Sequence, residues 1–312
     1  MLNKKDFYIN GKWVKPLEPR NHKVIDPSNE ETCAEISLGG KKDIDNAVSA
    51  AKKAFETWAF SKKEERLELL EKLYVVYKKR WAEMAKLISL EMGAPMKFST
   101  EMQAATGASH IKSFKNILKD FKFEKDLGEE KNNQKLLYEP KGVCALITPW
   151  NWPINQVNLK VIPALASACT VVLKPSEIAP LSSMLLAEMI DEVKFPSGVF
   201  NLVNGDGAIT GDALTSHPDV DMISFTGSTR AGALISQNAA KDFKRISLEL
   251  GGKGANIIFK DADTEAVARG VLRCFRNSGQ SCNAPTRMLV EKTIYNETVE
   301  KVKELANNTK VD

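Results

Sequence analysis

The chain has 312 residues, with 44 lysines and arginines against 40 aspartates and glutamates, and a formal net charge of +4. Hydrophobic residues make up 43% and charged residues 27%, a composition that excludes a disordered chain, a collagen and a coiled-coil rod. Basic and acidic residues alternate instead of forming a stripe of one sign, so nucleic-acid binding is not expected. The length predicts about two domains.

The sequence lacks the signals of a secreted, membrane or metal-binding protein. Residues 1–14 contain no apolar run typical of a secretory signal, and the longest apolar stretch, 161–173, is too short to span a bilayer. The five cysteines show no CxxC spacing and the three histidines are isolated, so neither a disulfide framework nor a metal site is expected. We therefore expect a cytoplasmic protein without a membrane segment.

The first 141 residues predict a hairpin, several helices and an exposed arm. Residues 7–14 contain two aromatic and β-branched runs around Asn10-Gly11, which is typical of a tight hairpin. Helical spacing of apolar residues predicts helices over 43–58, from a capping box at 61–64 to about residue 92, and over 97–120. Residues 121–141 are highly charged and predict an exposed arm or hairpin outside the core.

From residue 142 onward, apolar strand-like runs alternate with helical segments. The strand-like runs are 143–148, 170–173, 198–203, 222–226 and 257–259. The helical segments lie near 154–168, 182–193, 208–215, 230–240 and 264–276. This alternation predicts an α/β fold with a parallel sheet and helices on both faces, which binds ligands at the carboxyl ends of its strands.

Two glycine-containing turns follow predicted strands. Residues 205–207 follow the run that ends at Val203, and an ordinary strand-to-helix turn explains them without a ligand. Residues 227–229 follow the run 222–226 and open a helical segment, where free backbone N–H groups and the helix dipole suit a pyrophosphate. Neither turn is a strict dinucleotide fingerprint or a P-loop.

Lys174 and Glu177 flank a proline at the end of another predicted strand. A lysine there can donate to hydroxyl or phosphate oxygens, and a glutamate can accept from a ribose 2′-OH. Taken alone, a surface Lys-Pro turn is the simpler interpretation.

Cys282 and Glu249 are the candidate reactive groups. Small polar residues and Gly279 surround Cys282, which suits an accessible thiol with a tuned pKa, whereas the other four cysteines fit a buried structural role. Glu249 precedes two glycines, so it is either a solvated turn residue or a general base that substrate or water can approach.

Taken together, five segments resemble the aldehyde dehydrogenase superfamily in residue type, order and spacing. They are TPWNWP at 148–153, LKPSE at 173–177, FTGST at 225–229, ELGGK at 249–253 and GQSC at 279–282. The resemblance covers nearly the whole chain. It implies a Rossmann-like doubly wound parallel sheet built from 1–120 and 142–248, an oligomerisation arm at 121–141, and a partial second α/β catalytic domain over 249–312.

The resemblance also implies a chemistry: oxidation of an aldehyde to a carboxylic acid through a cysteine thiohemiacetal and a thioester. Cys282 would be the nucleophile, Glu249 the base that activates water, and the Asn151 amide, with the Cys282 N–H, the oxyanion donor. NAD is the implied cofactor, with NADP as the other option, and Glu177 favours NAD because a 2′-phosphate would meet its carboxylate. The implied cofactor-binding residues are Trp150, Lys174, Ser176, Glu177, Gly207, Gly227, Ser228 and Gly232.

The resemblance leaves the activity of this chain by itself open. Members of the family are longer, and a Glu-x-Phe-Gly-Pro segment that normally follows the nucleophile is absent from this sequence. Three explanations compete: a fragment of a longer product that is a homo-oligomer, half of a split enzyme, or a non-catalytic remnant. A CoA-acylating relative is disfavoured, since a water-activating Glu249 would waste the thioester. The sequence does not identify the aldehyde.

Overall fold

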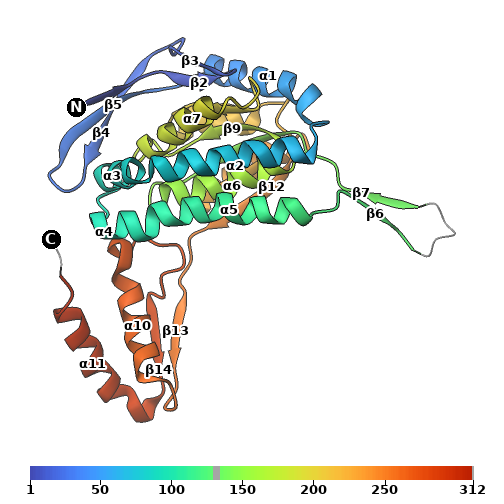
Figure 1. The fold of residues 1–312 in the computed structure, drawn as a ribbon. Helices are drawn as coiled ribbons and strands as arrows, with labels where there is room; N and C mark the ends of the chain where they lie inside the picture. Colours follow the sequence, from blue (N-terminus) through green and yellow to red (C-terminus); the bar gives the residue numbers. More distant parts are fainter. Residues whose placement is uncertain (129–133, 311–312) are drawn as a thin grey trace. The chain divides into compact units, whose positions relative to one another are not determined.

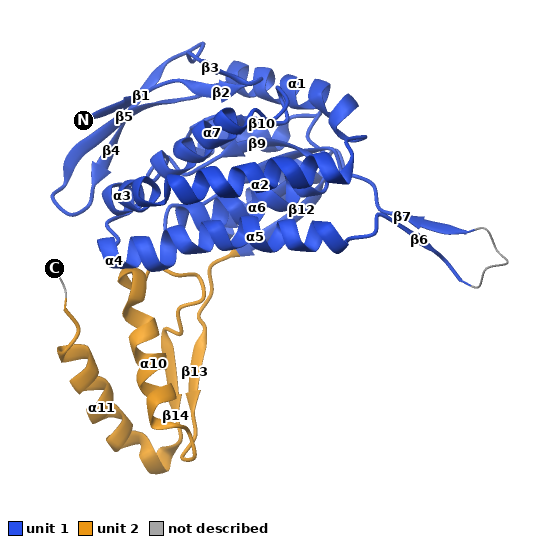
Figure 2. Ribbon diagram, viewed as in Figure 1, with its two compact units in different colours: residues 1–249 blue, residues 250–312 orange. Residues whose placement is uncertain are grey.

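The computed structural model describes residues 1–128 and 134–310. The chain divides into two compact units, 1–249 and 250–312 (Figure 2). The predicted ranges 121–141 and 249–312 include residues 129–133 and 311–312, which lie outside the described part. Among the described helices, none combines the length and apolarity that crossing a membrane requires.

A seven-stranded sheet forms the centre of the first unit (Figure 1), with the strand order β12-β11-β8-β9-β10-β2-β3. The strands are β2 (Phe7–Ile9), β3 (Lys12–Val14), β8 (Val143–Ile147), β9 (Thr170–Lys174), β10 (Phe200–Leu202), β11 (Met222–Gly227) and β12 (Arg245–Leu250). Strand β8 pairs in parallel with β9 and β11, and β9 pairs in parallel with β10. The predicted parallel α/β sheet is confirmed.

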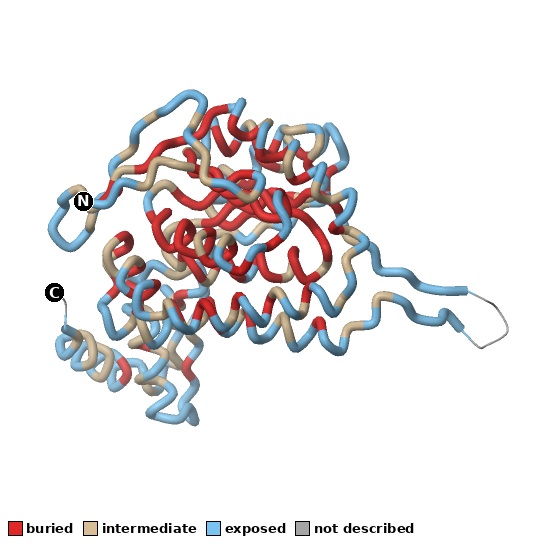
Figure 3. The backbone as a smooth tube through the Cα atoms, turned by 45° about the horizontal axis from the view of Figure 1, so that its top comes forward, coloured by how far each residue is buried: buried red, intermediate tan, exposed pale blue. Residues whose placement is uncertain are grey.

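The central strands are continuous apolar runs because both of their faces are covered. Every residue of β8 and β9 is buried, and Figure 3 shows the buried backbone concentrated in the sheet and in the helix faces that pack on it. The long covering helices are α1 (Lys41–Trp58), α2 (Lys63–Lys79), α3 (Trp81–Met92), α5 (Ala104–Asp120), α6 (Pro153–Ala166), α7 (Leu181–Val193) and α9 (Thr229–Ala240). The shorter ones are α4 (Met96–Phe98) and α8 (Asp212–Ser216).

Three predicted helices are less regular than their apolar spacing suggested. The single helix expected to end near residue 92 is wrong: α2 and α3 are separated at Arg80, whose backbone leaves the helical region at φ −99° and ψ 16°. Its predicted capping box is also wrong, because Lys62 is the N-cap and the Ser61 hydroxyl instead accepts from Arg66 at 3.0 Å. The helix predicted over 97–120 contains a π-helical turn at Ser99–Gln103. The helix predicted near 208–215 begins with another, at Gly207–Gly211.

A three-stranded sheet of order β1-β5-β4 was not predicted. Its strands are β1 (Leu2–Lys4), β4 (Arg20–Asp26) and β5 (Glu31–Leu38). Strand β4 is mostly polar and only Val24 in it is buried, so it carries almost no hydrophobic signal. This small sheet places Arg20 near the carboxyl ends of the main strands, through contacts described below.

The charged segment that follows α5 contains an antiparallel pair, β6 (Glu124–Asp126) and β7 (Lys135–Leu137). All six residues of the two strands are exposed, as are Leu127 and Tyr138 beside them. In Figure 1 the pair extends away from the central sheet.

The second unit is small. It contains a parallel pair, β13 (Ala255–Ile258) and β14 (Arg287–Val290), with helices α10 (Thr264–Phe275) and α11 (Tyr295–Asn307). Short 3₁₀ turns occupy Arg276–Gly279 and Lys292–Ile294. Strand β14 and the full extent of β13 were not predicted, because their exposed and half-buried residues alternate without a continuous apolar run.

Candidate cofactor site and catalytic residues

Two buried hydroxyl groups lie at the carboxyl ends of the neighbouring strands β8 and β11. Ile147 and Phe225 are register partners, so Thr148 and Thr226 follow directly on neighbouring strands. The Oγ1 atom of each threonine is buried and has no hydrogen-bond partner among the described residues. A buried polar atom without a partner is costly, and a ligand or a water molecule at this strand edge would satisfy both hydroxyls.

Lys174 ends the next strand, β9, opposite Ile147. Its ammonium is buried and donates to the carbonyl oxygens of Pro175 at 2.9 Å and Gly205 at 2.6 Å. The Glu177 carboxylate lies 3.6 Å away and is 30% exposed. Burial lowers the pKa of Lys174, and the negative charges of Glu177 and Asp206 oppose that shift. The structure thus has a buried ammonium beside an accessible carboxylate at the end of β9, and their role in binding a ribose stays a prediction.

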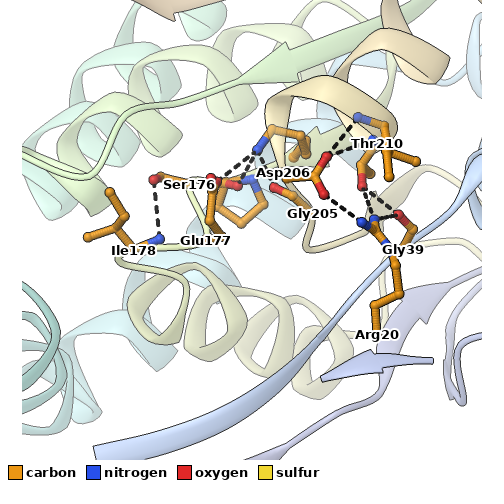
Figure 4. Close-up of polar contacts among 11 residues, drawn as sticks. Arg20, Gly39, Ser176, Glu177, Ile178, Gly205, Asp206 and Thr210 are labelled. Atoms are coloured by element: carbon orange, nitrogen blue, oxygen red, sulfur yellow. Dashed lines mark hydrogen bonds and ion pairs between the residues drawn. The ribbon is translucent and has the colours of Figure 1, made fainter. Parts of the chain in front are cut away.

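The glycine turn after β10 is held by Asp206. One carboxylate oxygen of Asp206 accepts the backbone N–H groups of Ile209 at 2.7 Å and Thr210 at 3.4 Å, which caps the π-helical turn. The other accepts from the Arg20 guanidinium at 2.6 Å (Figure 4). Burial raises the pKa of Asp206, but these N–H donors and the Arg20 charge outweigh it, so the net pKa is lowered.

Arg20 also ties this turn to the small sheet. Its guanidinium donates to the Gly39 carbonyl at 2.7 Å, and the Thr210 hydroxyl donates to the same carbonyl. Sequence reasoning missed both members of the Arg20–Asp206 pair. Asp206 between two glycines was a signal for a capped turn, whereas Arg20 lies on a strand that the sequence did not predict.

A cavity of about 470 Å³ lies at this strand edge. Its lining includes Lys174, Gly207 and the apolar side chains of Phe225, Leu234 and Ile235. A Cβ atom at Gly207 would meet no protein atom within 4 Å, so only a bound molecule could crowd that position. Apolar walls with a few polar groups are typical of small-molecule sites.

The N-terminus of α9 lies next to the cavity, which Ala231 lines. Ser228 is the N-cap, and its hydroxyl accepts from the Ala231 N–H at 3.3 Å. Gly227 has no room for a side chain, because a Cβ there would stand 2.5 Å from the Phe225 ring. Gly232 is buried in the first turn and donates to the Ser228 carbonyl at 3.0 Å. The exposed start of a twelve-residue helix is a suitable anion site.

Two other predicted cofactor residues have structural contacts. The buried Ser176 hydroxyl accepts from the Ile178 N–H at 3.3 Å, which supports the turn before α7. Trp150 is half-buried and packs against the hydrophobic core of the first unit. Neither residue lines the cavity described above, and their binding roles stay predictions.

Asn151 follows β8 and precedes Pro153, the first residue of α6. Its side-chain oxygen accepts from the Trp152 N–H at 3.1 Å, and its backbone carbonyl accepts from the Gln103 amide at 3.2 Å. The first contact orients the side chain of Asn151, and the second holds its backbone.

Glu249 lies on β12 and is exposed, so it is a strand residue and not the turn residue considered above. The nearby Lys160 of α6 is buried, and its ammonium donates to the Ser224 hydroxyl at 3.0 Å. Burial lowers the pKa of Lys160 to about 8, and the charge of Glu249 acts in the opposite direction. Lys160 was missed because the pattern of α6 marks only a buried helix face.

Cys282 belongs to the second unit and is exposed, whereas Cys144 and Cys169 are buried and the remaining two are half-buried. It follows a turn in which Asn277, Ser278 and Gly279 have φ values of 56°, 55° and 71°. Such a run of left-handed backbone is uncommon outside functional or tightly constrained turns. The structure thus singles out Cys282 by exposure, while its catalytic role stays a prediction.

Comparison with known proteins identifies the family. The sequence model of the aldehyde dehydrogenase family matches residues 13–312. The chain belongs to the aldehyde dehydrogenase family. Among curated proteins it is 52% identical over 292 residues to a 3-succinoylsemialdehyde-pyridine dehydrogenase from a Pseudomonas species.

Solved aldehyde dehydrogenases share the fold. A Bartonella henselae aldehyde dehydrogenase superposes with a TM-score of 0.98 at 59% identity over 99% of this chain. Aldehyde dehydrogenase C from Pseudomonas syringae, solved as a variant with NAD⁺ and octanal, superposes with a TM-score of 0.95 at 44% identity over 97% of it. The chain spans 60% of the Pseudomonas dehydrogenase, 65% of the Bartonella protein and 62% of the P. syringae protein.

Proposed function

We propose that the protein binds NAD and takes part in the oxidation of an aldehyde to a carboxylic acid. The observation that carries the proposal is the fixed Lys174 ammonium beside the accessible Glu177 carboxylate, at the edge of a cavity with apolar walls. The P. syringae relative and a Bacillus cereus relative, 33% identical, were both solved as NAD⁺ complexes. The unpartnered Thr148 and Thr226 hydroxyls also support NAD binding, because a polar ligand would satisfy them.

The residues present fit a dinucleotide. Glu177 would accept from the adenosine ribose and Lys174 would hold that carboxylate in place, while the apolar cavity suits an adenine ring. Gly227, Ser228 and Gly232 would present the N-terminus of α9 to the pyrophosphate. NAD is favoured over NADP because a 2′-phosphate would meet the Glu177 carboxylate.

Each catalytic residue would have the role that suits its chemistry. The Cys282 thiolate would attack the aldehyde carbon, and the Asn151 amide with the Cys282 N–H would stabilise the developing oxyanion. The bound nicotinamide supplies the acceptor for the hydride. Glu249 would then take a proton from the water that hydrolyses the thioester, which releases the carboxylic acid and regenerates the thiol.

The finer features of the assembly are also proposals. The exposed pair β6–β7, with Leu127, Leu136 and Leu137 at the surface, would serve as an oligomerisation element for copies of this chain. Replacing Leu137 by Glu should then lower the molar mass found by sedimentation. Five free cysteines support the reducing cytoplasm as its location.

NAD binding is tested by calorimetric titration of the purified chain. We expect saturable binding that Glu177→Ala weakens about tenfold or more, since a hydrogen bond to a charged group is lost. Glu192→Ala is the matched control, because Glu192 is an exposed carboxylate on α7. A wild-type chain that does not bind NAD would overturn the proposal.

A second candidate function is a nucleotide-binding subunit that needs another polypeptide for turnover. The apolar exposure of the second unit favours it, since Ile257, Phe259 and Leu289 are 59%, 61% and 53% exposed. We expect little NADH from octanal with the chain alone, and NADH production once the remaining third of the Bartonella relative is added as a separate polypeptide. Robust NADH production by the chain alone would exclude this candidate.

The same assay tests the catalytic residues. Cys282→Ala should abolish NADH formation, whereas Cys33→Ser, a change at a half-buried thiol, should leave it intact. Glu249→Gln should retain a single-turnover burst of NADH and lose the steady state, because hydrolysis is slowed more than hydride transfer. An unchanged steady state in Glu249→Gln would refute the assigned role.

A further inference from the structure

We propose that the ion pair between Arg20 and Asp206 keeps the adenosine-ribose edge of the cofactor site free of net charge, so that the Glu177 carboxylate decides its preference for NAD over NADP. The inference rests on the proposed function, because it takes the adenosine ribose to lie beside Glu177. Its subject is a pair of residues outside the five sequence segments that carry the family resemblance.

The pair is joined to the ribose edge through Lys174. The Gly205 carbonyl that accepts from Lys174 directly precedes Asp206, and the Asp206 charge acts on the Lys174 ammonium. Glu177 lies 3.6 Å from the same ammonium. In Figure 4 the Asp206 carboxylate is directed toward the Arg20 guanidinium, and Gly205 and Glu177 belong to the same group of polar residues.

The charges at this edge cancel in pairs. Lys174 stands against Glu177, and Arg20 stands against Asp206 at 2.6 Å. Asp212 and Arg230, which also line the cavity, add one charge of each sign. Removal of one member of the Arg20–Asp206 pair therefore leaves one uncompensated charge close to the ribose.

Such a charge acts differently on the two cofactors. NADP differs from NAD by a 2′-phosphate, a phosphate monoester that adds a charge of roughly −1.5 to −2 near neutral pH. With Arg20→Gln the Asp206 carboxylate is uncompensated and repels that phosphate. With Asp206→Asn the Arg20 guanidinium is uncompensated and attracts it. The asparagine keeps a side-chain oxygen for the Ile209 and Thr210 N–H groups, so the cap of the turn is retained.

The test is a double-mutant cycle on the ratio of the NADP and NAD dissociation constants, measured by calorimetry. We expect this ratio to rise about fivefold with Arg20→Gln and to fall about fivefold with Asp206→Asn, from one unit charge acting through solvent at close range. The double variant Arg20→Gln/Asp206→Asn should return toward the wild-type ratio. Both single shifts should shrink when the salt concentration is raised.

Controls separate this role from a purely structural one. Lys72 and Glu68 form a comparable 2.7 Å surface ion pair on α2, and Lys72→Gln or Glu68→Gln should leave the ratio unchanged. A structural role of Arg20 and Asp206 would weaken NAD and NADP binding by the same factor, and that result overturns the inference. A wild-type chain that binds neither nucleotide overturns the proposed function itself, and the inference with it.

Discussion

The two compact units differ in how completely they bury a parallel pair of strands. In the first unit every residue of β8 and β9 is buried, because helices cover both faces of the sheet. In the second unit β13 and β14 alternate between covered and exposed residues: Ile258 is 3% exposed and its neighbour Ile257 is 59% exposed. Both units thus contain a parallel pair of strands, but the pair is buried on both faces in the first unit and on one face only in the second.

The comparison predicts its largest effect in hydrogen exchange. Amides of β8 and β9 should exchange only on global unfolding, whereas those of β13 and β14 should exchange at least about a hundredfold faster through local opening. Exchange followed by mass spectrometry on the purified chain measures both pairs in one experiment. Equal protection of the two pairs would contradict the comparison and show that the exposed face of the second unit is stabilised by other means.

The same difference explains which parts of the fold the sequence could predict. Strands β8 and β9 are largely apolar and buried at every residue, and such runs are visible in a sequence because burial on both faces demands them. Strand β4 is mostly polar with Val24 as its buried residue, and β14 alternates between exposed and half-buried residues. Their positions depend on pairing with β5 and β13, which sequence periodicity does not reveal.

The site was predictable to the extent that its residues lie in short segments. Lys174 and Glu177 are three positions apart, and one local motif places them together. Arg20 and Asp206 are 186 positions apart, and Lys160 and Ser224 are 64 apart. Such pairs arise only when the two sheets and α6 are assembled, so no local pattern could have identified them.

A matched pair of isoleucines sharpens the comparison at the level of single side chains. Ile111 on α5 is fully buried in the first unit, so Ile111→Ala should lower the free energy of unfolding by about 2–5 kcal/mol. Ile257→Ala in the second unit should change it by less than about 0.5 kcal/mol. Urea denaturation of both variants measures the difference. A large loss with Ile257→Ala would mean that the exposed face contributes more than its burial indicates.

A buried carboxyl in the first unit predicts a pH dependence of intermediate size. Glu91 is 1% exposed and accepts the backbone N–H groups of Leu181 and Ser182 at the start of α7. Burial raises the pKa of Glu91 to about 7 from its ordinary 4.5. The folded state therefore holds this proton more tightly than the unfolded chain does. Its stabilising contribution is complete below pH 4.5 and is lost as the pH rises through about 7.

The total loss from this one carboxyl is roughly 3 kcal/mol. Glu91→Gln cannot ionise and should make the free energy of unfolding less dependent on pH between 5 and 8. Glu192→Gln, at an exposed position on α7, should retain the wild-type dependence. Urea denaturation at pH 5 and at pH 8 measures how the free energy of unfolding changes with pH. An unchanged pH dependence in Glu91→Gln would exclude Glu91 as its source.

The smallest effect expected is at two matched helix caps, one in each unit. The Asp263 carboxylate accepts from the Ala266 N–H at 2.7 Å at the start of α10, and Ser228 caps α9 in the same way at 3.3 Å. Loss of either cap, as in Asp263→Ala or Ser228→Ala, should cost about 1 kcal/mol.

The two losses should differ in where they are detected. In the second unit the cost should appear as faster local exchange of α10 amides, because that unit opens by itself before the first unfolds. In the first unit it should appear in global denaturation, because α9 packs against β11 of the main sheet. Asp263→Asn, which keeps a side-chain oxygen acceptor, should restore most of the protection of α10. A cap effect of Asp263→Ala that appears only in global unfolding would mean that the two units unfold together.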